Sequence, residues 1–188
     1  MSDNPSQVEL ALDDFVTRAL AHIEPGLFSQ LYDADWTSPC EVRQDCEQTL
    51  WRPTRQTERL DFSGLANAAE APIHQDIQTY YGLHWSGTLQ GKTEEGELSL
   101  IQIWNQEDFT RLLENLVGHL FHKVRAKQPF TIFFANTDDN SEFFLSVDNE
   151  SGAVLLEEPG RPPLREVAPD LASFIRRIEP DSREVAIY

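Results

Sequence analysis

Two groups of neighbouring carboxylates are the first candidates for chemistry in this chain. Glu107 and Asp108 are adjacent, and Glu94, Glu95 and Glu97 form a second group. A pair of carboxylates can hydrolyse a bond when one has a raised pKa and the other stays ionised. Side chains adjacent in sequence seldom have that geometry, and a chain with 32 acidic residues contains such neighbours by chance. We interpret both groups as solvated charges or charges at a helix start, and a hydrolase is the least favoured alternative.

Histidines and cysteines are the other residue types that often carry chemistry. His119 and His122 are three residues apart, whereas zinc-binding helices place two histidines four apart with a glutamate between them. A mid-helix histidine that bonds a carbonyl is the favoured interpretation of this pair. Cys40 has no base nearby in the sequence to lower its pKa, and we expect Cys40 and Cys46 to be reduced thiols. The sequence thus predicts no enzyme, no metal and no cofactor.

Four tryptophans could anchor an interface, because exposed aromatic rings with polar neighbours often contribute strongly to binding. They are Trp36, Trp51, Trp85 and Trp104. Packing in the core is the default expectation for each ring, and the interface role is the open alternative.

Charge limits the possible partners more than any motif does. The 188 residues carry 32 acidic and 15 basic side chains, a formal net charge of -17. Such a chain repels phosphate backbones and anionic lipid headgroups, so we expect neither nucleic acid binding nor direct lipid insertion. A basic protein surface is favoured instead, with an encounter that salt weakens. The acidic start of the chain and the lack of a long apolar run predict a soluble cytoplasmic protein.

Capping residues and helical periodicity predict the helices. Ser6-Gln7-Val8-Glu9 has the form of a capping box, and a helix should run from there to Pro25. Asn105 should cap a second helix that ends before Pro129. Its predicted apolar face is Phe109, Leu112, Leu113, Leu116, Val117, Leu120, Phe121 and Val124. Further helices are expected over 64–70, 73–81 and 171–178.

Alternating apolar residues and turn signals predict the strands. Residues 83–90 and 97–104 should form a hairpin around the turn at 91–96. An antiparallel meander is expected over 130–136, 142–147 and 153–157, and a short strand over 49–52. Residues 128–158 hold seven acids and no base, which predicts an electronegative rim on the meander. Residues 27–48 show no clear period and should be irregular.

Several sequence blocks resemble the Syd family, the SecY-interacting proteins of bacteria. The likeness covers about residues 36–178 and is strongest over 102–123, whereas the amino-terminal helix, within 1–24, matches in character only. Gln75 and Val117 stand where proline and isoleucine are common in the family, and neither difference alters a charge. The matching blocks are Ser38-Pro39-Cys40, Trp51-Arg52-Pro53, Ile73-His74-Gln75-Asp76-Ile77, Tyr80-Tyr81-Gly82, 102–123 and 129–135.

The resemblance implies a fold. The Syd family is similar to the wider SUKH group, which consists of α+β domains that mostly act as binding modules. We therefore expect residues 1–188 to form one SUKH-like α+β domain, with a mainly antiparallel, mixed sheet and helices packed against it.

The resemblance also implies a function. Syd-like proteins are cytoplasmic and meet the inner membrane by docking on SecY, whose cytoplasmic loops are basic. An acidic groove would receive those loops and help to monitor assembly of the SecYEG translocon without chemistry, and a monomer is expected. The alternative is a SUKH-type immunity protein that neutralises a basic toxin. The residues expected near the groove are the acids Asp76, Glu107, Asp108 and Glu114 and the aromatic anchors Trp51 and Trp104.

Overall fold

The computed structural model describes residues 5–137 and 141–181. The helices in these residues are α1 (Gln7–Ala21), α2 (Ser63–Ala69), α3 (Gln75–Leu83), α4 (Gln106–Arg125) and α5 (Leu171–Ile175). The strands are β1 (Phe28–Leu31), β2 (Glu41–Asp45), β3 (Gln48–Trp51), β4 (Thr54–Arg55), β5 (His84–Trp85), β6 (Leu89–Thr93), β7 (Gly96–Leu100), β8 (Thr131–Thr137), β9 (Phe144–Asp148), β10 (Val154–Glu157), β11 (Arg165–Ala168) and β12 (Glu179–Pro180).

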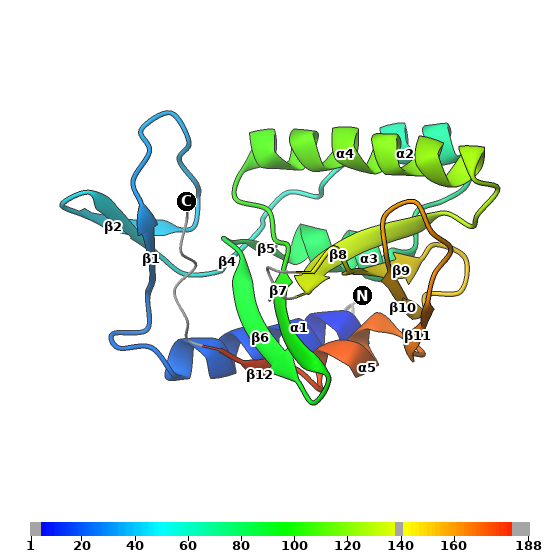
Figure 1. Ribbon diagram of the computed structural model, residues 1–188. Coiled ribbons are helices and arrows are strands. Elements are labelled where there is room, and N and C mark those ends of the chain that lie inside the picture. Colours follow the sequence, from blue (N-terminus) through cyan, green and yellow to red (C-terminus); the bar gives the residue numbers. More distant parts are fainter. Residues whose placement is uncertain (1–4, 138–140, 182–188) are drawn as a thin grey trace.

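A seven-stranded antiparallel sheet forms the centre of the molecule, in the order β11-β10-β9-β8-β7-β6-β12. Helices α4 and α2 lie above it in Figure 1, and α1 and α5 lie below. This arrangement confirms the expected α+β fold. The predicted meander is also confirmed, because β8, β9 and β10 are consecutive antiparallel neighbours.

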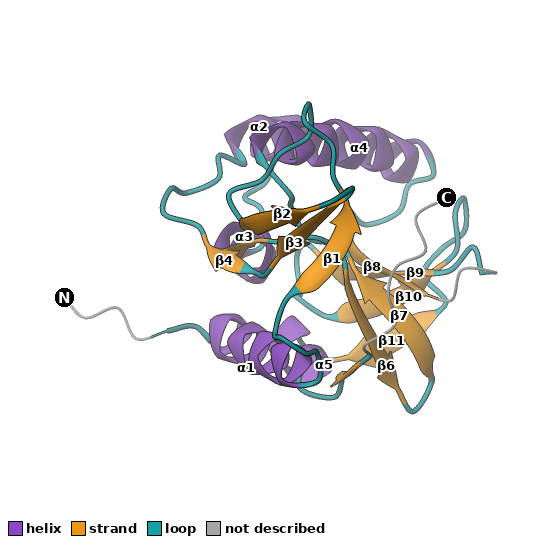
Figure 2. Cartoon of the chain, turned by 90° about the vertical axis from the view of Figure 1, so that its left-hand side faces the viewer, coloured by secondary structure: helices purple, strands orange, loops and turns teal. Residues whose placement is uncertain are grey.

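The prediction of an irregular segment over 27–48 is wrong. Strands β1 and β2 lie in this segment and pair with β3 on either side, in the order β1-β3-β2. We call this three-stranded sheet the arm, and it projects to the left in Figure 1 and faces the viewer in Figure 2. Four of the five β2 residues are exposed, so β2 lacks the apolar alternation that marks a half-buried strand.

The predicted hairpin is confirmed, but its strands are shifted. Helix α3 continues to Leu83, and β6 includes Gly91, which the sequence had suggested as a turn residue. A Cβ at Gly91 would lie 2.4 Å from Ile178 Cγ2. Glycine is thus needed inside β6 because the chain around Ile178 packs directly against the backbone there.

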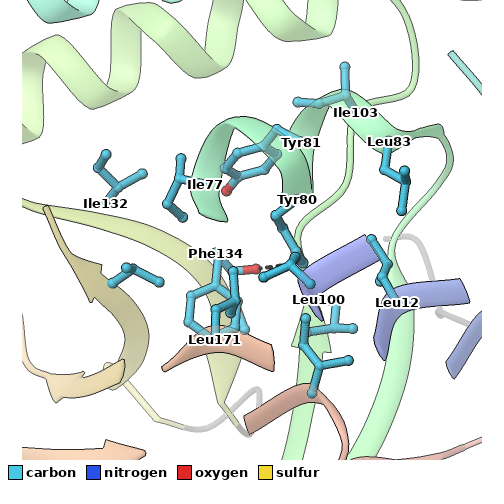
Figure 3. Close-up of a cluster of buried hydrophobic side chains, with 14 of the residues drawn as sticks. Leu12, Ile77, Tyr80, Tyr81, Leu83, Leu100, Ile103, Ile132, Phe134 and Leu171 are labelled. Carbon is cyan, nitrogen blue, oxygen red and sulfur yellow. Dashed lines mark hydrogen bonds between the residues drawn. The ribbon is translucent and has the colours of Figure 1, made fainter. Parts of the chain in front are cut away.

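Two tyrosines of α3 fasten the helix to the centre of the sheet. The Tyr80 hydroxyl donates to the carbonyls of Ile101 at 3.1 Å and Phe134 at 3.2 Å. The Tyr81 hydroxyl donates to the Phe133 carbonyl at 2.7 Å. Figure 3 shows both rings among buried aliphatic side chains, with the bond from Tyr80 to Phe134 dashed. Since each buried hydroxyl has a partner, α3 can be buried without an unsatisfied polar group.

Charged side chains join α1 to the strand pair β4-β5. Ser6 caps α1 as predicted, by accepting the Glu9 amide at 3.1 Å. The Glu9 carboxylate binds Arg55 at 2.8 Å, and Arg55 also pairs with Asp13. Asp13 in turn lies 3.2 Å from Nε2 of the buried His84. Burial, aided by the charge of Arg55, lowers the pKa of His84 to about 4.

We expect Leu12→Ala to lower the free energy of unfolding by about 2–5 kcal/mol, because Leu12 is fully buried and truncation leaves a cavity. Leu10→Ala on the same helix is the matched control, since Leu10 is 45% exposed and should cost under about 0.5 kcal/mol. Urea unfolding of both variants measures the difference. Equal costs would contradict the packing of α1 described above.

The protein should lose stability on mild acidification through His84. Its folded pKa of about 4 lies below the ordinary value of 6.5, so the stabilisation is complete above about pH 6.5 and declines as the pH falls toward 4. Between pH 7.5 and pH 5 the loss from this group should be about 2 kcal/mol. His84→Gln should reduce the slope of the urea-midpoint profile in this range, with His22→Gln, on an exposed histidine, as the control.

Candidate functional site

Helix α4 begins with a reciprocal cap. The Asn105 side chain accepts the Asp108 amide at 2.9 Å, and the Asp108 carboxylate accepts the Trp104 amide at 2.9 Å. This confirms Asn105 as the cap and gives Asp108 a structural role at the positive end of the helix dipole.

The start of α4 is also attached to the segment that follows β1. The Trp104 indole donates to the Trp36 carbonyl at 2.8 Å, and the Asn105 amide donates to the Thr37 carbonyl at 2.8 Å. The Arg111 guanidinium stacks 4.5 Å above the Trp36 ring. Each of these contacts joins residues more than sixty positions apart, so together they fix the arm relative to α4.

The two tryptophans proposed as anchors lie inside the protein. Trp51 is 3% exposed and Trp104 is 4% exposed, and their rings meet edge to face with centroids 5.7 Å apart. Phe28 stacks on Trp51 at 4.6 Å, and a Cβ at Gly87 would lie 2.6 Å from the Trp51 ring. Little of either ring is therefore free to touch a partner. A direct contact between these rings and a partner stays a prediction.

A cleft of about 360 Å³ lies between the arm and the start of α4. Asp33 and Leu31 from the arm side line it, and Trp104 and Asp108 line it from the helix side. Two of the six predicted residues, Trp104 and Asp108, are thus brought together, with Trp51 in contact behind Trp104. The remaining residues lining the cleft are Gln30, Trp36, Ser86, Gly87, Thr88 and Gln102.

The other predicted acids do not line this cleft. Glu107 and Glu114 are exposed on α4, seven residues apart and hence on one face of the helix. Asp76 lies at the start of α3, where His74 bonds Asn149 in the turn between β9 and β10. Burial, with a contribution from Asp170, raises the pKa of Asp76, although His74 opposes the shift.

A larger hollow lies against the other half of α4, and no motif in the sequence predicts it. This groove has a volume of about 1110 Å³. His122 and Arg125 line it from α4, and Glu142 and Glu158 line it from the strand side. Its described charges are therefore mixed, and Asp138 and Asp139 of the predicted electronegative rim lie outside the described residues.

A buried ion pair forms part of the groove wall. Lys123 is 4% exposed and Glu157 is 1% exposed, and the two pair directly while the Ser146 hydroxyl donates to the other oxygen of Glu157. His119 Nε2 lies 3.0 Å from the Thr131 hydroxyl, so this histidine bonds a hydroxyl rather than the expected carbonyl. Burial, reinforced by the charge of Lys123, lowers the pKa of His119.

The buried face of α4 differs at its end from the predicted apolar face, because it includes Lys123. Phe109, Leu112, Leu116 and Leu120 are buried as expected, but the next buried position is Lys123. Phe121 and Val124, which the periodicity predicts on the apolar face, are instead each 63% exposed. Leu113 and Val117, predicted on the same face, are partly buried. The periodicity was right, but the acidic Glu157 opposite the last turn selects a cation there.

The described residues offer little for chemistry. They contain no group of three or more histidines, cysteines and carboxylates that could hold a metal. Burial raises the pKa of the Cys40 thiol to about 12, so it stays protonated and is a poor nucleophile. Both cysteines are free, and Cys46 is exposed. Within the described chain, no helix is long and apolar enough to cross a membrane.

Lys123→Met should lower the free energy of unfolding by about 3–5 kcal/mol, because it leaves the buried Glu157 carboxylate without its counter-charge. The double variant Lys123→Met/Glu157→Leu should recover most of that loss in urea unfolding at neutral pH. Lys127→Met, on an exposed lysine, is the control. A single variant as stable as this control would contradict the ion pair.

Comparison with known proteins places the chain in a family. The family model described as Syd protein (SUKH-2) matches residues 9–180. Protein Syd of Pseudoalteromonas atlantica is 40% identical over 187 residues, which cover 95% of this chain and 99% of the relative. Protein Syd of Alteromonas mediterranea is 37% identical over 175 residues, with 92% and 96% covered. These matches confirm the resemblance found in the sequence, and the chain belongs to the Syd family.

Proposed function

We propose that this protein docks on SecY at the cytoplasmic face of the SecYEG translocon and acts by binding alone. Membership of the Syd family across residues 9–180 is the observation that carries the proposal. The net charge of -17 supports it, because cytoplasmic loops of membrane proteins are rich in lysine and arginine. Opposite charge speeds the encounter and disfavours wrong partners.

The proposed contact surface is the acidic surface at the start of α4. Glu107 and Glu114 project from one face of the helix, and Asp33 adds a carboxylate to the cleft. Asp108, Trp104 and Trp51 support this surface from within, through the cap and the ring contacts. Asp76 starts a different helix, so it contributes only if the partner also covers α3, which a complex as large as SecYEG can do.

The proposed role is to monitor translocon assembly as a monomer held peripherally at the membrane through SecY. Binding that prefers one state of SecY shifts the population toward that state without any reaction. No observation favours the alternative of an immunity protein against a basic toxin.

Capture of SecYEG in detergent by the purified protein tests the proposal. We expect capture at low salt that weakens as salt rises, because exposed charges are screened. Glu107→Lys/Glu114→Lys should weaken binding by about tenfold or more, since it replaces two attractive charges with repulsive ones. Asp108 is left unchanged because its substitution would loosen the cap.

Glu94→Lys/Glu150→Lys is the matched control, with the same change in net charge at exposed positions outside α4. It should retain most of the binding. Equal losses in both variants would mean that net charge, and not this surface, selects the partner. If the wild-type protein captures no SecYEG even at low salt, the SecY proposal fails.

A further inference from the structure

The outer surface at the end of α4 carries the most exposed large apolar side chains of the described residues. Phe121 and Val124 are each 63% exposed, the highest value among the exposed large hydrophobic side chains of the described residues. They are three residues apart on one side of the helix, which runs along the upper edge of the molecule in Figure 1. Neither side chain lines the groove, and both are open to solvent.

Cationic side chains accompany this apolar pair. Arg125 and Lys127 are both exposed, and within the described residues neither forms an ion pair with a carboxylate. We call Phe121, Val124, Arg125 and Lys127 the terminal patch. It stands out in a chain with a net charge of -17.

Neighbouring acids do little to neutralise the terminal patch. Glu157 is committed to Lys123, and Glu158 lies 3.3 Å from Arg161. The nearest acid before the patch on α4 is Glu114, about 10 Å along the axis from Phe121. Glu142 and Arg125 both line the groove, but the two form no ion pair. The patch thus combines exposed apolar surface with two cations that form no ion pair with the carboxylates of residues 5–137 and 141–181.

We propose that, when this protein is docked on the translocon, the terminal patch rests on anionic lipid headgroups beside it. This inference rests on the proposed function, which brings the protein to the membrane. Two exposed apolar side chains followed by two exposed cations suit a deformable anionic surface, which needs no matching hollow. Anionic headgroups supply the charge that complements Arg125 and Lys127.

The contact is too weak to bring the free protein to a membrane. Each cation near an anionic leaflet contributes only about 1 kcal/mol, and the rest of the chain is repelled. Docking on SecY lowers the entropic cost of the lipid contact, because a second contact on the same assembly is effectively intramolecular. The expectation that the chain does not bind bare membrane is therefore compatible with the proposal.

Binding to SecYEG in lipid nanodiscs, compared with SecYEG in detergent, tests this contact. We expect about tenfold tighter binding to discs that contain phosphatidylglycerol than to discs of phosphatidylcholine alone. Phe121→Ser/Val124→Ser, and separately Arg125→Gln/Lys127→Gln, should remove this preference and leave capture in detergent unchanged. Leu10→Ser is the control, because Leu10 is exposed on α1, on the other side of the sheet.

The outcomes separate the two proposals. Equal affinity for both kinds of disc would overturn the lipid contact and leave SecY docking intact. Weaker capture in detergent by the Phe121→Ser/Val124→Ser variant would also overturn it, because the patch would then touch SecY itself. If no form of SecYEG is bound, SecY docking fails, and the lipid contact is decided by tethering the protein to vesicles.

In that assay an amino-terminal histidine tag holds the protein on vesicles that contain a nickel-chelating lipid. A polarity-sensitive dye on Val124→Cys, in a Cys46→Ser background, reports contact, and Cys40 stays unlabelled because it is fully buried. We expect a blue-shifted emission on phosphatidylglycerol vesicles and none on phosphatidylcholine vesicles. The same dye on Leu10→Cys should not respond. An equal response at both positions, or none at Val124→Cys, would overturn the proposal.

Discussion

The hydrogen-bond network at the start of α4 is the constraint on which the candidate surfaces depend. Asn105 and Asp108 close the helix start, and Trp104 and Asn105 also bind the backbone of the segment after β1. The arm cannot move far from α4 without losing several of these bonds together. The cleft therefore exists because one short stretch satisfies a helix terminus and a distant segment at once.

The end of α4 depends on a different interaction, the buried pair of Lys123 and Glu157. Such a pair adds little net stability over apolar residues, but removing one partner is costly. Together with the buried residues Phe109, Leu112, Leu116 and Leu120, it defines which face of α4 is turned inward. That orientation leaves Phe121 and Val124 outside and places His119 against Thr131.

Opposite charges at the two ends of α4 follow the helix dipole. Acids at the first turn and cations at the last turn stabilise the helix itself, and the same side chains give the ends different surfaces. An acidic start suits the basic loops of a channel protein, and a cationic, partly apolar end suits headgroups. In the proposed complex, one helix thereby orients the protein between SecY and the lipid around it.

Local signals in the sequence determined the helix caps at Ser6 and Asn105, the β8–β10 meander, the net charge and the Syd likeness, because each depends on nearby residues or on composition. Only the tertiary structure decided the pairing of β1 with β3, the shift of the β6–β7 hairpin and the burial of Trp51, Trp104 and Lys123. It also separated Asp76 from the acids of α4. These outcomes depend on contacts between residues far apart in the chain. Local hydrophobic periodicity does not specify which distant residue a side chain will contact.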